Sequence, residues 1–218
     1  MTDWTSLDYA VVDVEGNGQQ PPDLVELAVV PIRSGVIAEP VSWLVRPGEP
    51  IRHFATRIHG LTNEDVAGAP LFTDIADQVL AALDMPALVA HNAHVDVDVL
   101  TRKLAGWQPP EVFDTLRIAR RLLPGRAGYR LGALTSAFHL ADGLPSRLSP
   151  HRAEYDALVA ARLFVKLATR AATLEELRGS PPGKEEDDAP SLFLTVPAAC
   201  SSPWTGQAAP ASPPSWST

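Results

Sequence analysis

The sequence predicts an α/β fold in which helices pack on a mixed sheet, and two patterns support this prediction. Apolar runs at 9–12, 24–32 and 36–45 are separated by short turns, which is typical of three strands in an antiparallel meander. Later apolar runs at 86–90 and 112–113 alternate with segments that have helical spacing. Strands followed by an alternation of strands and helices indicate an α/β sandwich around a mixed, five-stranded sheet.

The helical segments are marked by apolar spacing and by start signals. From Phe72 to Leu83, apolar residues recur at intervals that place them on one face of a helix. Thr62 is a predicted N-cap, and Asp65 three residues later forms an approximate capping box. Asp114 is expected to cap a helix that starts at 115. Further helices are expected over 94–105, 115–123, 131–140 and 151–172.

The chain is expected to hold one sizeable domain and a C-terminal tail. Its 218 residues are enough for a single large core. The composition changes near residue 179, because the last 40 residues hold 8 of the 21 prolines and an acidic run at 185–188. Such a segment buries too little apolar surface to offset the entropy of ordering it. We therefore predict one globular domain over 1–178 and a disordered Pro/Ser/Ala-rich tail over 179–218.

Composition limits the functional class and the compartment. A formal net charge of −8 argues against a protein that coats nucleic acid non-specifically. No apolar run approaches the roughly 20 residues of a membrane span. The acidic N-terminus does not resemble a secretory signal, and the single cysteine, Cys200, excludes an internal disulfide. These observations predict a soluble, cytoplasmic protein without membrane partners.

Positive charge is nevertheless concentrated in one stretch. Between 117 and 152 there are seven arginines and one acidic residue, Asp142. They belong either to solvated helix faces or to a local basic rim on which a phosphodiester backbone could lie. The arginines are Arg117, Arg120, Arg121, Arg126, Arg130, Arg147 and Arg152.

The first chemical signal is Asp13-x-Glu15, at the end of the first predicted strand. Side chains alternate along a strand, so the two carboxylates point the same way, about 6–7 Å apart. They repel each other unless a cation or a proton is present, and residues 1–30 contain no Lys or Arg. Glycines at 16 and 18 then turn the chain and leave backbone amides open to a ligand. Alone, such a pair is more often an ordinary solvated one.

Two further blocks make the signal specific. The sequence H-N-A-H-V-D at 91–96 places Asp96 just after a short strand, and H-R-A-E-Y-D at 151–156 places His151 five residues before Asp156. In this order the three blocks resemble the DEDDh family of 3′→5′ exonucleases. That family includes the proofreading epsilon subunit of bacterial DNA polymerase III, ribonuclease T and oligoribonuclease. The resemblance covers about 7–172, including I-H-G-L-T at 58–62, similar to the family's I-H-G-I-T.

The resemblance implies a ribonuclease H-like fold and a two-metal site. Asp13, Glu15, Asp96 and Asp156 match the family's acids, which bind two Mg²⁺ or Mn²⁺ ions about 3.5–4 Å apart. Asp13 would bridge both ions, Glu15 and Asp156 would share one, and Asp96 would act partly through water. His151 matches the general base that takes a proton from the attacking water, a role that contributes roughly 10²–10⁴-fold to the rate.

The local sequence also predicts the position of His151 and the residues that contact substrate. Ser149 and Pro150 are typical of an N-cap and a first helical position, which would place positions 151 and 156 about 140° apart on a helix. We therefore expect His151 to swing inward only with substrate bound. The residues expected to contact substrate are Gly16, Asn17, Gly18, His59, Asn92 and Arg152.

The first block departs from the family's common D-x-E-T-T-G form, because Gly-Asn-Gly-Gln follows Glu15. The resemblance implies that threonines and an apolar wedge normally lie beside the 3′-terminal nucleotide. Here backbone amides could serve, and the wedge is lost or supplied elsewhere. Val95 stands where phenylalanine is usual, which we interpret as a packing change. These departures bear on substrate preference rather than on the reaction.

The sequence thus predicts a metal-dependent exonuclease that releases nucleoside 5′-monophosphates from single-stranded 3′ ends, with DNA favoured over RNA, in proofreading or repair. The alternatives are an RNA-trimming enzyme of the ribonuclease T or oligoribonuclease kind, a small-nucleotide phosphodiesterase, and a non-catalytic nucleic-acid-binding or polymerase-bridging module. In the tail, A-P-S-L-F at 189–193 resembles part of the peptides that dock proteins on the bacterial sliding clamp, or is a simple apolar cluster. A DNA polymerase or a sliding clamp is therefore an expected partner.

Overall fold

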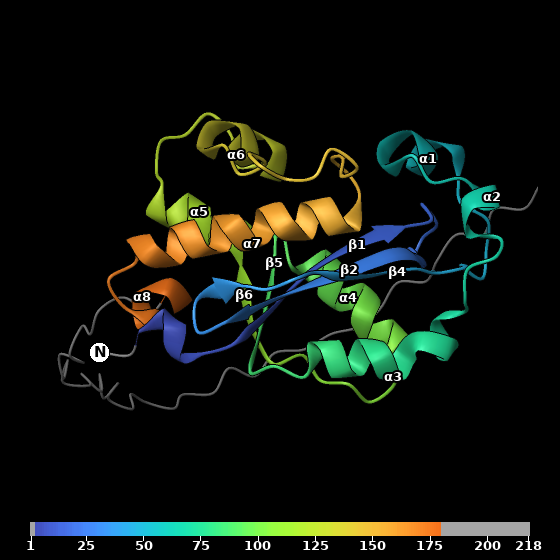
Figure 1. Cartoon of the computed structure of the whole chain (residues 1–218), viewed down its shortest axis with the longest axis horizontal. Coiled ribbons are helices and arrows are strands. Elements are labelled where there is room, and N and C mark those ends of the chain that lie inside the picture. The colour runs from blue at the N-terminus through green and yellow to red at the C-terminus, as the bar shows by residue number, and fades with distance from the viewer. Residues whose placement is uncertain (1–2, 180–218) are drawn as a thin grey trace, which may run out of the picture. The chain divides into compact units, whose positions relative to one another are not determined.

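The computed structural model describes residues 3–179, which fold around one mixed sheet (Figure 1). Within these residues the sheet has six strands in the order β3-β2-β1-β5-β6, and β4 also pairs with β2. β1 runs antiparallel to β2 and parallel to β5, and β6 is parallel to β5, so the predicted mixed sheet is confirmed. The strands are β1 (Tyr9–Gly16), β2 (Leu24–Arg33), β3 (Val36–Ile37), β4 (Val41–Leu44), β5 (Ala87–Ala90) and β6 (Glu111–Asp114).

The expected third strand, 36–45, is split in two, which is why the sheet has six strands and not five. Pro40 has no backbone N–H to donate to a neighbouring strand. β3 therefore pairs with the end of β2 at Ile32 and Arg33, whereas β4 pairs with its beginning, from Glu26 to Val29.

Helices cover both faces of the sheet, with α3 and α4 on one face and α5, α6 and α7 on the other (Figure 1). The predicted bounds of α3 are confirmed, and so is the capping box that Thr62 and Asp65 form at α2. The helices α1 and α8 were not predicted. The helices are α1 (His53–His59), α2 (Asn63–Val66), α3 (Phe72–Leu83), α4 (His94–Lys103), α5 (Thr115–Leu122), α6 (Leu131–Phe138), α7 (Ala153–Arg170) and α8 (Leu174–Arg178).

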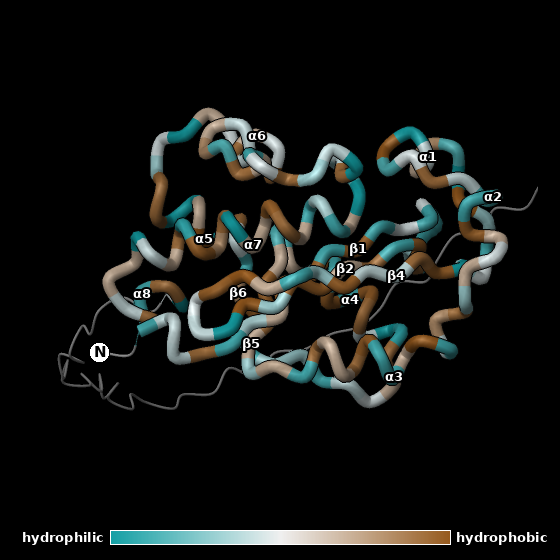
Figure 2. Tube along the Cα trace, viewed as in Figure 1, coloured by the Kyte–Doolittle hydropathy of each residue, from teal (hydrophilic) through white to brown (hydrophobic). Residues whose placement is uncertain are grey.

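The alternation of side chains along β1 divides the core into two layers. Tyr9 and Val11 pack against α7, where the Tyr9 ring lies 4.7 Å from that of Phe164. Val12 packs on the opposite face with residues of α3 and α4. Figure 2 shows hydrophobic residues concentrated along the central strands. The same alternation sends the next odd-numbered residues of β1 toward the α7 side, just beyond the core.

Two further predictions concern membrane-spanning helices and the C-terminal tail. Among residues 3–179, none of the helices has the length and apolar character needed to cross a membrane. The predicted tail, with its clamp-like A-P-S-L-F sequence, lies outside the described residues apart from Gly179.

Candidate active site

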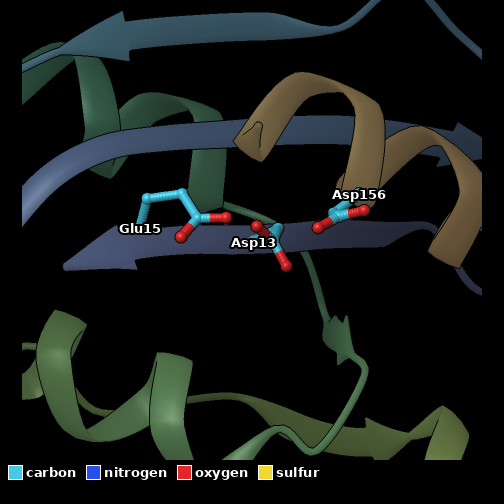
Figure 3. A group of neighbouring side chains, drawn as sticks. All are labelled: Asp13, Glu15 and Asp156. Atoms are coloured by element: carbon cyan, nitrogen blue, oxygen red, sulfur yellow. The ribbon is translucent and has the colours of Figure 1, made fainter. Parts of the chain in front are cut away.

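Three carboxylates meet where β1 leaves the sheet. Asp13 and Glu15 extend from one face of β1, and Asp156 reaches them from the first turn of α7 (Figure 3). Each contributes one oxygen atom, and these three oxygens lie within 4.8 Å of one another. The structure therefore brings together three of the four acids that the sequence predicted as metal ligands. Oxygen donors at this spacing fit a hard divalent cation.

A bulge ends the pairing of β1 at this point. Glu15 lies opposite Glu26 of β2, but Gly16 pairs with Leu24, so one residue of β2 is skipped. A Cβ on Gly16 would lie 3.1 Å from Cβ of Pro22, so the close passage of the chain favours glycine. Bulges at strand ends commonly re-aim side chains at functional sites. This bulge leaves the two acids of β1 at the open edge of the fold.

Asp96, the fourth predicted acid, approaches from the other face of the sheet. It lies in the first turn of α4 and is only 5% exposed. Its Oδ1 accepts a hydrogen bond of 3.1 Å from the N–H of Val14, which ties α4 to β1 between the two strand acids. Asp96 is not part of the tight group of three oxygens, but its charge raises the pKa of Asp13.

Burial and neighbouring carboxylates raise the pKa values of the four acids, and the charges of Arg152 and His151 offset these shifts only in part. Burial raises the pKa of Glu15 to about 8, and the charges of Asp156 and Glu26 add to this shift. Burial also raises the pKa of Asp96 to about 7 and the pKa of Asp156 to about 6. The pKa of Asp13 lies well above its ordinary range because burial combines with the charges of Asp96 and Asp156. A bound cation would favour the charged forms and reverse these shifts.

His151 lies at the mouth of the acidic group, but its conformation differs from the prediction. α7 begins at Ala153 with Arg152 as its N-cap, so the expected helical position of His151 is wrong. Its φ of +62° is left-handed, which is uncommon for a residue other than glycine. Its backbone N–H donates to Oδ2 of Asp156 at 3.2 Å, and its Nδ1 lies 4.0 Å from the same oxygen. A tight turn, rather than a helix, therefore brings the two residues together.

Arg152, predicted to contact substrate, is instead paired with Glu26 of β2. Its Nε and Nη2 donate to the two carboxylate oxygens at 2.9 and 2.7 Å. Glu26 is 4% exposed and also accepts a hydrogen bond of 3.0 Å from the N–H of Ala153. Sequence analysis missed Glu26, although an acidic residue within the apolar run 24–32 was a signal.

Asn17, another predicted substrate contact, is completely buried. Its side-chain amide donates to the carbonyl of Glu49 at 3.1 Å, and its Oδ1 accepts from the N–H groups of Gln19 and Asp23. These hydrogen bonds fix the loop that follows β1. The predicted contact of Asn17 with substrate stays a prediction.

Helix α1 supplies an exposed apolar surface that the sequence analysis did not identify. Phe54 and Ile58 lie one turn apart and are 46% and 53% exposed. Gly18 lies against Phe54, because a Cβ at this position would be 2.8 Å from the ring, and its φ of +78° also favours glycine. His59 is buried, its Nδ1 accepts from the N–H of Leu61, and burial lowers its pKa. Its Nε2 is also buried and has no hydrogen-bond partner among residues 3–179.

The block at 91–96 is fixed by contacts with the beginning of α5. Nδ1 of His91 lies 2.9 Å from Oγ1 of Thr115, and the N–H of Asn92 donates to Oδ1 of Asp114 at 3.0 Å. Asp114 also caps α5, as predicted. Val95 is 41% exposed, so its interpretation as a packing position is wrong.

Five of the seven arginines of 117–152 have partners inside the domain. Arg121 donates to the carbonyls of Glu176 and Leu177 in α8. Arg126 lies over the ring of Phe138. The remaining partners are Asp114 for Arg117, Glu154 for Arg147 and Glu26 for Arg152.

Comparison with known proteins identifies the family. Residues 10–164, which include all four acids and His151, match the RNase T family, described as exonuclease. The chain belongs to this exonuclease family. Exodeoxyribonuclease 10 of Escherichia coli is 34% identical over 185 residues, which are 85% of this chain and 77% of that protein. The 3′-5′ exonuclease DinG of Bacillus subtilis is 33% identical over 180 residues, and PolC-type DNA polymerase III of Streptococcus mutans is 32% identical over 168.

The match to DinG covers 79% of this chain but only 18% of DinG, and the match to PolC covers only 11% of PolC. Among solved structures, Exonuclease X in complex with 5′ overhanging duplex DNA has a TM-score of 0.66 and 33% identity, with 78% of this chain and 96% of that chain covered. Escherichia coli exonuclease I, at 16% identity and a TM-score of 0.61, shares the fold. The predicted DEDDh exonuclease family and ribonuclease H-like fold are thus confirmed, and the chain contains an exonuclease-family domain.

Proposed function

We propose that the protein removes nucleotides from the 3′ ends of single-stranded DNA and releases nucleoside 5′-monophosphates. The observation that carries the proposal is the group of Asp13, Glu15 and Asp156, whose oxygens lie within 4.8 Å of one another. Burial raises the pKa values of all three and the charges of neighbouring carboxylates add to the shifts, and acids perturbed in this way are typical of functional sites. His151 beside them adds a group that can accept a proton.

The carboxylate oxygens of this group are proposed to bind two Mg²⁺ or Mn²⁺ ions. Carboxylate oxygens are the donors that these hard cations require, and the group contains no sulfur or imidazole ligand. Asp13, Glu15 and Asp156 would hold the ions, and Asp96 would support the site from α4. When bound, the ions would supply Lewis-acid stabilisation of the charge that develops on the scissile phosphate.

His151 is proposed as the general base for the attacking water. Its side chain is 63% exposed, so it can reach a substrate at the mouth of the site. The carboxylate of Asp156, 4.0 Å from Nδ1, would stabilise the positive charge that the imidazole acquires. As predicted from the sequence, the ring would move toward the phosphate when substrate binds.

The apolar surface of α1 supports a single-stranded substrate. Phe54 offers an aromatic face on which a base can stack, and stacking tolerates any base sequence. We favour DNA over RNA because of the similarity to exodeoxyribonuclease 10 and to Exonuclease X in its DNA complex. Similarity to DinG and PolC supports a role in DNA repair or proofreading.

A labelled-oligonucleotide assay tests this function. Single-stranded DNA and RNA of matched sequence, labelled at either end, are incubated with Mg²⁺, Mn²⁺ or EDTA. We expect stepwise shortening from the 3′ end of DNA, which is lost with EDTA and in the Asp13→Ala/Glu15→Ala double variant. Faster shortening of RNA than of DNA would show that RNA is the preferred substrate. No shortening of either polymer would contradict the proposed reaction.

A further inference from the structure

One buried ion pair lies directly beside the acidic group. The two oxygens of Glu26 accept from Nε and Nη2 of Arg152, and one of them also accepts from the N–H of Ala153. Arg152 is the N-cap of α7, and Ala153 is its first residue. A single carboxylate on β2 therefore holds the start of α7 through both a side chain and the backbone.

This pair lies between the two groups that the proposed reaction needs from α7. Arg152 directly follows His151, and Asp156 lies in the first turn of the helix that Glu26 anchors. No side-chain cap holds this helix start, since Arg152 contributes no capping hydrogen bond to it. The left-handed turn at His151 is therefore held on one side by its hydrogen bond to Asp156 and on the other by Glu26.

We propose that Glu26 and Arg152 form a positioning pair that fixes His151 and Asp156 for catalysis, and that Arg152 does not bind the substrate phosphate. The inference rests on the proposed nuclease function. Two donors of the guanidinium fork are already used by Glu26. Moving Arg152 to a phosphate would leave the buried carboxylate of Glu26 without its cation, beside Glu15 on the neighbouring strand, which is unfavourable.

The first test separates positioning from substrate binding. Arg152→Lys keeps the charge but loses the two-pronged contact with Glu26. Arg147→Lys is the matched control, because Arg147 lies in the same segment and pairs with Glu154 at the surface, where its side chain is 66% exposed. We expect Arg152→Lys and Glu26→Gln to lower kcat by about 10–100-fold, as a misplacement of about 1 Å does, with KM changed less than about threefold. Arg147→Lys should leave kcat near that of the wild type.

A salt series tests whether Arg152 instead binds a phosphate of the substrate. An arginine that neutralises one phosphate of a single strand contributes about 0.7 to the slope of log K against log salt. The slope for a single-stranded oligonucleotide, measured with EDTA to prevent cleavage, should be the same for Arg152→Gln and the wild type. A slope that falls by about 0.7 in Arg152→Gln would assign Arg152 to the substrate and overturn the inference.

A double variant tests whether the pair acts through His151. In a His151→Ala background, Arg152→Lys should lower kcat by a clearly smaller factor than in the wild type, because the part of its effect that acts through His151 is already lost. An unchanged 10–100-fold loss in that background would overturn the inference.

Hydrogen exchange tests the positioning pair without any need for activity. An inactive wild type would contradict the proposed function, but it would leave this test of the pair intact. The backbone N–H of His151 should exchange with solvent about tenfold faster or more in Arg152→Lys than in Arg147→Lys, as expected when a local structure opens more easily. Equal exchange in the two variants would show that the pair does not hold this turn.

Discussion

Two glutamates face each other across β1 and β2, and they have opposite electrostatic surroundings. Glu15 and Glu26 are register partners in the antiparallel ladder. Glu26 is neutralised by the two-pronged contact with Arg152 and by a backbone N–H. Glu15 has neighbouring carboxylates instead, and its pKa is raised to about 8 by burial and by the charges of Asp156 and Glu26.

The contrast distinguishes a structural acid from a ligand-binding acid. A buried carboxylate with a cation and hydrogen bonds holds two elements together, as Glu26 holds β2 and α7. A carboxylate kept among like charges destabilises the empty site and becomes favourable only when a cation arrives. A glutamate therefore stabilises the fold on β2, at Glu26, whereas a glutamate on β1, Glu15, is proposed to take part in the chemistry.

Replacing each glutamate with glutamine should give the largest difference between the two residues, in both activity and stability. Glu15→Gln should lower activity by about 10³-fold or more, because several kcal/mol of metal-assisted stabilisation are lost. Without metal, it should also raise the free energy of unfolding by about 0.5–2 kcal/mol, as relief of active-site repulsion does. Glu26→Gln should instead lower the free energy of unfolding by roughly 1–3 kcal/mol, because Arg152, about a third exposed, loses its charged partner.

Denaturant unfolding with EDTA and single-turnover cleavage measure these two effects. If Glu15→Gln were as destabilising as Glu26→Gln, the distinction between the two acids would be wrong.

His151→Ala should reduce the rate by roughly 10²–10⁴-fold, the usual contribution of a general base. The side chain is 63% exposed and packs little, so the melting temperature should stay close to that of the wild type. His139→Ala is a suitable control, since His139 also has a positive φ and an exposed side chain but lies at the end of α6. Equal losses of rate in both variants would exclude a special role for His151.

The unbalanced acids should make metal-free stability depend on pH. The raised pKa values of Glu15, Asp96 and Asp156, about 8, 7 and 6, mean that the folded state holds protons that the unfolded state has released above about pH 4.5. Stability should therefore fall as pH rises from 5.5 to 8.5 with EDTA. A loss of about 2 kcal/mol would lower the melting temperature by about 4–8 °C.

Thermal unfolding across this pH range is the measurement, with Glu15→Gln as the variant that should show a shallower slope. A metal-free wild type that becomes more stable toward pH 8.5 would contradict the account.

The apolar surface of α1 should affect binding without touching either glutamate. Phe54→Ala should weaken binding of single-stranded DNA by about 1–3 kcal/mol, the value of one stacked base. Leu80→Ala, at an exposed position of α3 with 39% exposure, is the control and should not change affinity. Fluorescence anisotropy with EDTA compares them, and equal affinities in the two variants would remove Phe54 from the proposed site.

The sequence predicted most of the sheet because local signals specify it, whereas the resemblance to the exonuclease family predicted the set of acidic residues. Alternation along β1 places Asp13 and Glu15 on one face, and the apolar spacing of 72–83 predicts the bounds of α3. Pro40 was visible in the sequence, and its effect on the third strand could have been predicted from its missing N–H.

The contacts that were missed join distant parts of the chain. Ser149 and Pro150 resemble a helix start, but the start of α7 is set by Glu26, which lies 126 residues away from Arg152 in sequence. Asn17 follows the acidic block and resembles a ligand residue, yet its side chain is used by the loop at Glu49. Local sequence does not encode such partners.

The most direct test of the account is a calorimetric titration of Mn²⁺ into the metal-free wild type, Glu15→Gln and Glu26→Gln at pH 8. Wild type and Glu26→Gln should bind the ion and release protons from the acids whose pKa values are raised, whereas Glu15→Gln should bind it at least about tenfold more weakly. Binding of Mn²⁺ by Glu15→Gln with the affinity of the wild type would contradict the claim that the unbalanced acids form the metal centre.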